Sequence, residues 1–254
     1  MDPKIVIGLS FLENLKELKR MRESLPKDIP IIAINGAYDD FQTYHRYSLD
    51  GSKEYLLSFP NTEVIDYAAL QPAKRQKYLD RAGELGYDYL IIMDSDEFVH
   101  PEYNDWNLFK ENLVRMAEEN PRDQLFFMEM WMPKDWDRAH NNIELDRFQK
   151  WGRVIKNPGS VKYAFWCHYR LLRKEFTEQD VITRKTDVLK AHHIIEGVRF
   201  ATDSRLRTPD FLKRREKWAF NQMHAEWKKI NDFFLAPENV EKVKEYVATT
   251  TTTG

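Results

Sequence analysis

Two aspartates, Asp94 and Asp96, stand one residue apart directly after the apolar run 89–93. An apolar run of this length, entered through Gly86, predicts a buried strand rather than an exposed one. The two carboxylates are therefore expected where the strand leaves the core, which is the edge at which open α/β sheets bind ligands. Such a pair suits a hard divalent cation that also holds a diphosphate, and Glu97 adds a third acid.

The motif is weak by itself, because the chain holds 41 acidic residues and repeats the spacing at Asp135 and Asp137. Either pair could consist of solvated aspartates in turns. The position favours Asp94 and Asp96 as a metal site, since they end the most apolar strand and follow three strand–helix units. Asp135 and Asp137 follow a strand by several residues, and their role stays open at this point.

Alternating strands and helices would position Asp94 and Asp96 at the edge of a sheet. Apolar runs predict strands over 4–10, 29–34, 62–66, 89–94 and 124–132, and helical spacing predicts helices over 12–25, 72–86 and 105–119, with a broken helical stretch over 41–59. Strands that alternate with helices in this way indicate a largely parallel, Rossmann-like sheet.

The second half of the chain has a different pattern. Residues 151–156 and 161–166 read as two strands joined by a tight turn at 157–159, and a polar stretch leads to the apolar segment 188–195. Long helices are expected over 209–230 and 237–247. We therefore predict one α/β domain over 1–205, a C-terminal helical extension over 206–248, and a disordered tail over 249–254.

Composition narrows the class of protein. The chain has 254 residues with 39 basic and 41 acidic side chains, a net charge of −2, so no global positive field points to nucleic acid. Cys167 is the only cysteine, which excludes an internal disulfide and a cysteine-rich zinc site. No stretch approaches the roughly 20 apolar residues of a membrane span, and the first residues lack a signal peptide's apolar segment. We expect a cytoplasmic protein.

Three segments together resemble a known family: the loop 35–41 (Asn-Gly-Ala-Tyr-Asp-Asp-Phe), the Lys-Arg-x-x-Tyr-Leu pattern at 74–79, and Tyr-Leu-Ile-Ile-Met-Asp-Ser-Asp-Glu at 89–97. The chain resembles a family 2-type glycosyltransferase of the GT-A fold over roughly residues 4–200. The resemblance implies a single GT-A domain that transfers a sugar from a UDP- or GDP-sugar. It also implies Mn²⁺ or Mg²⁺ between the Asp-x-Asp carboxylates and the diphosphate, with Asp96 as the direct ligand and Asp94 facing the ribose or sugar.

Further site residues follow from the resemblance. The ends of the first three strands would hold the base and ribose, and here they offer Ser10, Asn35, Asp39 and Asp66. The family commonly has an aspartate where Asn35 stands, which leaves the identity of the base open.

Lys74 and Arg75 lie in the first turn of the helix before the Asp-x-Asp strand, so they can reach the same edge. The alternative is an ordinary solvated helix face, which Lys77 and Arg81 would continue.

His192 and His193 are candidate metal ligands, because such enzymes often take a third ligand from a C-terminal histidine and imidazole is compatible with manganese. His193 is slightly preferred, and a purely structural role remains the alternative for both.

An inverting transferase needs a carboxylate within hydrogen-bond reach of the acceptor hydroxyl. Asp137 and Asp135 are the candidates, with Glu129 less favoured, and nearby tryptophans could stack on a sugar or simply pack. The acceptor would be a glycan or a lipid-linked sugar, and the basic, aromatic stretch 213–229 leaves peripheral membrane contact as a less favoured alternative.

Three rival functions remain, of which a nucleic-acid-binding module is disfavoured by the net charge. A non-catalytic nucleotide-sugar-binding protein could keep the Asp-x-Asp pair and lack the base. A metal-dependent phosphotransferase could also use such a pair, but the haloacid dehalogenase pattern calls for Thr or Val where Phe98 stands.

Overall fold

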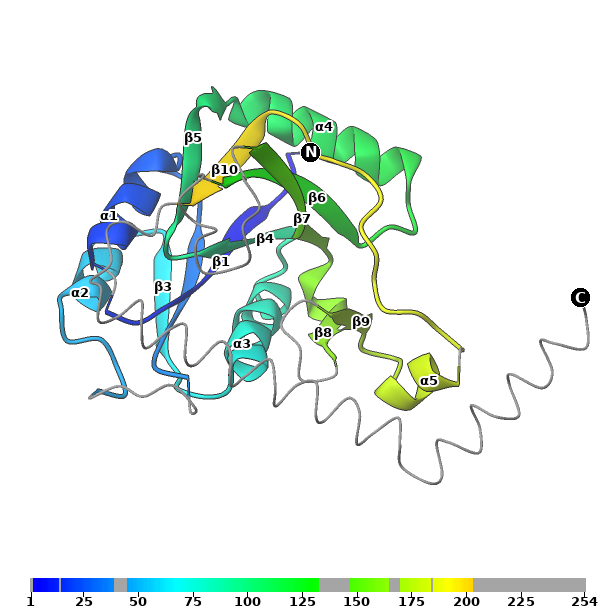
Figure 1. Ribbon diagram of the computed structural model, residues 1–254, viewed down its shortest axis with the longest axis horizontal. Coiled ribbons are helices and arrows are strands. Elements are labelled where there is room, and N and C mark those ends of the chain that lie inside the picture. The colour runs from blue at the N-terminus through cyan, green and yellow to red at the C-terminus, as the bar shows by residue number, and fades with distance from the viewer. Residues whose placement is uncertain are drawn as a thin grey trace, which may run out of the picture.

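The computed structural model describes residues 2–13, 15–38, 45–132, 147–164, 170–183 and 185–202. Its centre is an eight-stranded sheet in the order β3-β2-β1-β4-β7-β6-β10-β5, flanked by helices (Figure 1). β5 and β7 run antiparallel to their neighbours, and the other strands point the same way. The expected α/β class with a mostly parallel sheet is confirmed. The predicted helical extension and tail lie outside the described residues.

The N-terminal half is the predicted series of strand–helix units. Its strands are β1 (Ile5–Phe11), β2 (Ile31–Asn35), β3 (Thr62–Asp66) and β4 (Tyr89–Asp94), and its helices are α1 (Leu15–Ser24), α2 (Ser52–Leu57) and α3 (Gln71–Glu84). Every residue of β1 and β2 is buried, because helices cover both faces of these strands. That double burial explains why their sequences are continuous apolar runs without alternation.

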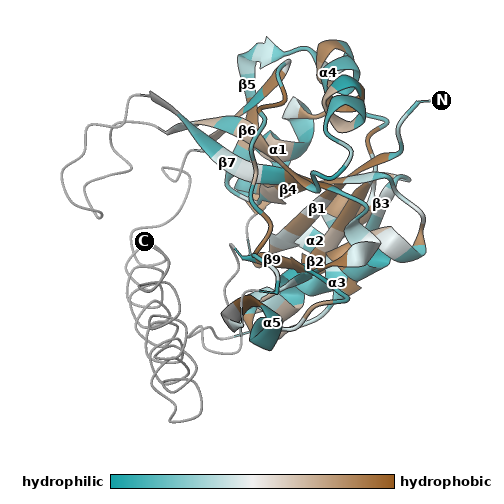
Figure 2. Ribbon diagram, turned by 90° about the vertical axis from the view of Figure 1, so that its right-hand side faces the viewer, coloured by the Kyte–Doolittle hydropathy of each residue, from teal (hydrophilic) through white to brown (hydrophobic). Residues whose placement is uncertain are grey.

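Two apolar layers hold the helices to the sheet. On one face, side chains of β1 and β4 such as Leu9 and Met93 pack with Leu18 of α1 and Phe109 of α4. On the other face, Ile92 and its neighbours pack with Leu79 of α3. Figure 1 shows α1 and α4 on the first side and α3 on the second, and Figure 2 shows the apolar residues gathered on the central strands.

The strand order reverses between β1 and β4. The chain passes from β1 to β2 and β3 on one side, and then returns to place β4 on the other side of β1. At the carboxyl ends of this pair, Ser10 lies opposite Asp94 in the parallel register. In open α/β sheets such a reversal opens a crevice in which ligands bind.

The second half supplies the remaining elements: β5 (Glu97–Asn104), α4 (Trp106–Glu119), β6 (Leu125–Met132), β7 (Arg147–Lys156), the 3₁₀ turn η2 (Pro158–Ser160), β8 (Val161–Tyr163), β9 (Leu171–Arg173), α5 (Glu178–Ile182) and β10 (Val198–Thr202). The hydrophobic pattern of the sequence does not predict the strands β5, β9 and β10. Segment 188–195 contains one isolated bridge, between Ile194 and Phe127, and no regular strand.

The expected pairing of 151–156 with 161–166 is wrong. β7 lies in the large sheet between β4 and β6, whereas β8 pairs with β9 in a separate two-stranded sheet. The cause is the intervening turn: Asn157 has a φ of 52°, and Pro158 begins η2, which carries the chain towards α3. Gly83 of α3 and Gly159 of η2 approach so closely that a Cβ on Gly83 would lie 2.4 Å from the Cα of Gly159.

None of the helices in the described part of the chain combines the length and the apolar composition that a membrane crossing requires.

Candidate functional site

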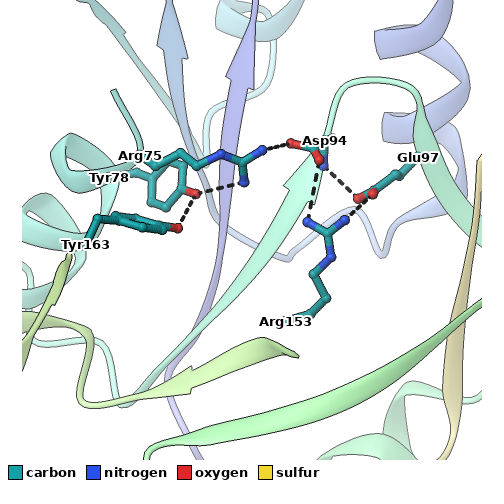
Figure 3. A network of polar contacts seen from close by, with 6 residues as sticks. All are labelled: Arg75, Tyr78, Asp94, Glu97, Arg153 and Tyr163. Atoms are coloured by element: carbon teal, nitrogen blue, oxygen red, sulfur yellow. Dashed lines mark hydrogen bonds and ion pairs between the residues drawn. The ribbon is translucent and has the colours of Figure 1, made fainter. Parts of the chain in front are cut away.

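Asp94, the last residue of β4, lies between two guanidinium groups (Figure 3). Its Oδ1 is 2.5 Å from Nη2 of Arg75, which α3 contributes, and its Oδ2 is 3.5 Å from Nη1 of Arg153, which β7 contributes. Arg153 also places Nη2 2.5 Å from Oε1 of Glu97. The backbone N–H of Asp94 donates to the other Glu97 oxygen at 2.7 Å. Three strands and a helix thus converge on one ionic network.

Only one side chain of this network reaches solvent to a large extent. The Asp94 side chain is 32% exposed, against 5% for Arg75, 9% for Arg153 and 4% for Glu97. The arginines therefore lie beneath Asp94, and Asp94 presents the open surface. A ligand that approaches this edge of the sheet meets the carboxylate first and finds the cations behind it.

Burial and the ion pairs set the protonation of these groups. Burial raises the pKa of Glu97 to about 8, although Arg153 acts in the opposite direction. Burial alone would lower the pKa of Arg75, but the Asp94 carboxylate and the neighbouring tyrosines together outweigh it and raise that pKa above its ordinary value. Arg75 therefore stays charged under the carboxylate.

Two tyrosines support Arg75 from below. The Tyr78 hydroxyl lies 3.4 Å from Nη1 of Arg75 and 3.1 Å from the Tyr163 hydroxyl. Burial raises the pKa of both phenols, so they stay neutral at physiological pH. The Tyr78 hydroxyl offers Arg75 an oxygen acceptor without adding negative charge, and Tyr163 holds that hydroxyl in place.

The alternative interpretation of Lys74 and Arg75 as a solvated helix face is wrong, because both side chains are buried. Arg75 reaches the Asp94 edge, as its place in the first turn of α3 indicated. Lys74 instead donates to the carbonyl of Gly36, in the loop after β2, and its ammonium lies 4.7 Å from the ring centre of Tyr38. Burial, with a contribution from Arg75, lowers the pKa of Lys74 to about 7.

Three of the predicted base and ribose residues, Ser10, Asn35 and Asp66, lie along the same edge. The Ser10 hydroxyl is buried and finds no hydrogen-bond partner in the part of the chain that the structure describes. The Asn35 amide donates to Asp66 at 2.9 Å and accepts from Ser48, so its carbonyl oxygen is already used inside the protein. Asp39 lies outside the described residues.

Asp66 keeps an open carboxylate at the end of β3. Its side chain is 39% exposed and pairs with Nζ of Lys53 at 2.5 Å. Partial burial tends to raise the pKa of Asp66, but the hydrogen bonds from Lys53 and Asn35 outweigh this and lower it. The group is therefore a persistent anion and hydrogen-bond acceptor at this edge of the sheet.

The histidine pair lies elsewhere on the sheet. Phe127 of β6 donates to the carbonyl of His193 on the side of β6 that faces β10, so β6 and β7 separate this histidine from β4. Its Nε2 is 3.4 Å from Oδ2 of Asp123. The described residues contain no cluster of three or more His, Cys, Asp or Glu side chains suited to a metal ion. A ligand role for His192 or His193 stays a prediction.

The candidate bases are placed only in part. Asp135 and Asp137 lie outside the described residues. Glu129, the less favoured candidate, forms an ion pair with Arg199 of β10 at 2.6 Å.

The carboxylate oxygens of Asp94 and Asp96 are of the type that a hard cation takes as ligands, and a metal role for the pair stays a prediction. Each oxygen of Asp94 faces one guanidinium, so a bound ion would use the lone pairs on the solvent side of that carboxylate. Asp96 follows in the turn after β4 and is 8% exposed. Within the described ranges these carboxylates are the candidate ligands, and the remaining positions would fall to water or a diphosphate.

Arg153 is the site residue that sequence reasoning missed. It stands in β7, far along the chain from Asp94, at a register irregularity between Phe126 and Phe127 of the neighbouring strand. Bulges of this kind redirect a side chain. The available signal was a charged residue next to the apolar pair Val154-Ile155 in a predicted strand.

The chain matches no protein-family model and no curated protein. Among solved structures it is similar to TarS of S. aureus in complex with UDP-GlcNAc, at 13% identity and a TM-score of 0.33, over 51% of this chain and 34% of that one. It is also similar to mannose-1-phosphate geranyltransferase from Thermus thermophilus, at 10% identity and a TM-score of 0.29, over 51% of this chain and 42% of that one.

HddC from Yersinia pseudotuberculosis is similar at 16% identity and a TM-score of 0.31, over 85% of this chain and 99% of that one. The chain spans about a third of the length of the TarS chain. Likenesses at this level assign no function, which has to come from the site itself.

Proposed function

We propose that this chain is a glycosyltransferase that takes its sugar from a nucleotide diphosphate donor. The observation that carries the proposal is the position of Asp94: it ends β4 opposite Ser10 at the reversal of strand order, with Arg75 and Arg153 behind it. The exposed Asp94 carboxylate over buried cations, with Asp96 in the turn that follows, suits a diphosphate with its metal ion.

Each group then has a chemical task. Bond cleavage leaves a nucleoside diphosphate with increasing negative charge, which preorganised positive groups stabilise. When bound, Mn²⁺ or Mg²⁺ at Asp94 and Asp96 supplies a Lewis acid for that charge. Arg75 and Arg153 hold the Asp94 carboxylate in one orientation and balance its charge. Asp66, an exposed acceptor at the end of β3, suits a donor N–H or hydroxyl of the base or ribose.

The acceptor would bind beyond the end of β6. β4 and β6 both run antiparallel to β7, so the carboxyl end of β6 lies at the same edge of the sheet as Asp94. Asp135 and Asp137 follow β6 in the chain, which supports one of them as the general base of an inverting reaction on a glycan or lipid-linked hydroxyl.

The test is donor turnover with a panel of UDP- and GDP-sugars, with and without manganese. Asp96→Asn should abolish manganese-dependent release of UDP or GDP while leaving the thermal unfolding midpoint close to that of the wild type. Asp187→Asn is the matched control, because the Asp187 side chain is 79% exposed and outside the site. Full turnover by Asp96→Asn would refute the assignment, and donor binding without any turnover in the wild type would identify a non-catalytic nucleotide-sugar-binding protein.

A further inference from the structure

The two arginines that hold Asp94 also line a cavity of about 340 Å³ on the α3 side of the sheet. Apolar side chains form most of the remaining wall, among them Ile92 of β4 and Leu171 of β9. A third cation, Lys150 of β7, completes the lining. The volume lies at the lower end of the range for small-molecule sites, which is about 300–1,000 Å³.

The charge of this lining is one-sided. Arg75, Lys150 and Arg153 contribute to it, and its lining residues include no aspartate or glutamate. Figure 3 shows the acids that partner the arginines, Asp94 and Glu97. Neither acid is part of the cavity lining. Asp94 and Glu97 balance part of the charge of the two arginines, but Lys150 adds a cation without an acidic partner among the described residues. A concave site with low-dielectric walls and a net positive charge concentrates anions.

Two of the donors that surround the cavity have capacity for a ligand. Nε of Arg75 is buried and finds no acceptor among the described residues, a situation that costs free energy unless water or a ligand supplies one. Lys150 has an exposed side chain that forms no ion pair with any described residue. Glu129, its cross-strand neighbour, is paired with Arg199 instead.

We propose that this cavity is a binding site for a phosphate group, held by Arg75, Lys150 and Arg153. Guanidinium and ammonium groups together supply the charge-assisted donors that phosphate oxygens accept. The inference rests on the proposed function in one respect: the phosphate belongs either to the donor's diphosphate or to a phosphorylated sugar acceptor. Phosphate from either source would bind the same three cations, and competition between the bound probe and UDP distinguishes the two sources.

The experiment measures binding of inorganic pyrophosphate and of glucose 6-phosphate by calorimetry in excess chelator, so that no metal ion contributes. The wild type should bind at least one probe, and Lys150→Glu should weaken that binding by about tenfold or more, since a hydrogen bond to a charged group is lost and repulsion replaces it. Lys110→Glu is the matched control: it makes the same charge change on α4, which packs on the opposite face of the sheet.

UDP that displaces the probe would assign the site to the donor's diphosphate, and a probe that stays bound beside UDP would assign it to a phosphorylated acceptor. Lys150→Gln, which removes charge without reversing it, and circular dichroism of each variant guard against misfolding. The proposal is wrong if the wild type binds neither probe, or if Lys150→Glu binds as tightly as the wild type. If the wild type still turns over the nucleotide-sugar donor in either of these cases, the cavity proposal alone has failed and the proposed function stands.

Discussion

Replacing Lys74 with methionine should change how the stability of the protein depends on pH. Lys74 is 1% exposed, and burial lowers the pKa of its ammonium to about 7, against 10.5 in an unfolded chain. Below pH 7 the lysine is protonated in both states, so folding carries the full cost of burying a charge. Between pH 7 and 10.5 the folded protein releases this proton and the unfolded chain keeps it, so stability rises with pH.

The size of the effect follows from those two values. One pKa unit corresponds to about 1.4 kcal/mol, and integration from pH 7 to pH 9 gives a gain of about 2 kcal/mol for the wild type relative to Lys74→Met. Below pH 7 the difference in free energy of unfolding between the wild type and Lys74→Met should be constant. As pH rises through 7, the difference should shift in favour of the wild type. Methionine fills nearly the same volume, so packing changes little.

The assay is urea unfolding at pH 6, 7, 8 and 9, followed by tryptophan fluorescence. The free energy of unfolding of Lys74→Met is subtracted from that of the wild type at each pH. Lys77→Met controls for the loss of a lysine from the same helix, because the Lys77 side chain is exposed. A difference that stays constant from pH 6 to pH 9 would refute the assignment of a neutral, buried amine.

Two further substitutions test local features of the fold by the same unfolding assay. Gly83→Ala should lower stability by about 1–3 kcal/mol despite the better helix propensity of alanine, because the new Cβ would meet the backbone of Gly159 at 2.4 Å; equal or higher stability would show that this contact relaxes. Asp105→Ala should lower the free energy of unfolding by about 1 kcal/mol, because the Asp105 carboxylate caps α4 by accepting from two backbone N–H groups. Asp105→Asn should keep most of this stability, since asparagine is also a good N-cap.

The first four strands could be predicted because their physics is local. β1, β2 and β4 are apolar runs bounded by turn residues, each of the first three strands is followed by a helix, and the motif at Asp94 stands where the pattern placed it. Arg75 was found for the same reason, since the first turn of the helix that precedes a parallel strand points towards the strand's carboxyl end.

The rest of the site depends on pairings between distant segments. Arg153 reaches Asp94 only because β7 inserts beside β4, and nothing in residues 147–156 specifies that neighbour. β5 contains Pro101, which argues against a central strand and is acceptable at the edge position that β5 occupies. The pairing of 151–156 with 161–166 failed because the turn residues Asn-Pro-Gly were compatible with either a hairpin or a change of direction.

The place of β5 in the sheet has a consequence for the order of assembly. Two residues of turn separate β4 from β5 in the chain, yet β7, β6 and β10 lie between them in the sheet. β5 is synthesised before all three, and its hydrogen-bonding partner, β10, comes from residues 198–202. During translation the first four strands can assemble from nearby segments, whereas β5 has to wait with open backbone groups until the chain has grown past residue 202. Glu97, which opens β5, therefore gains its permanent surroundings among the last parts of the domain, and a ribosome that stalls earlier leaves the site unfinished.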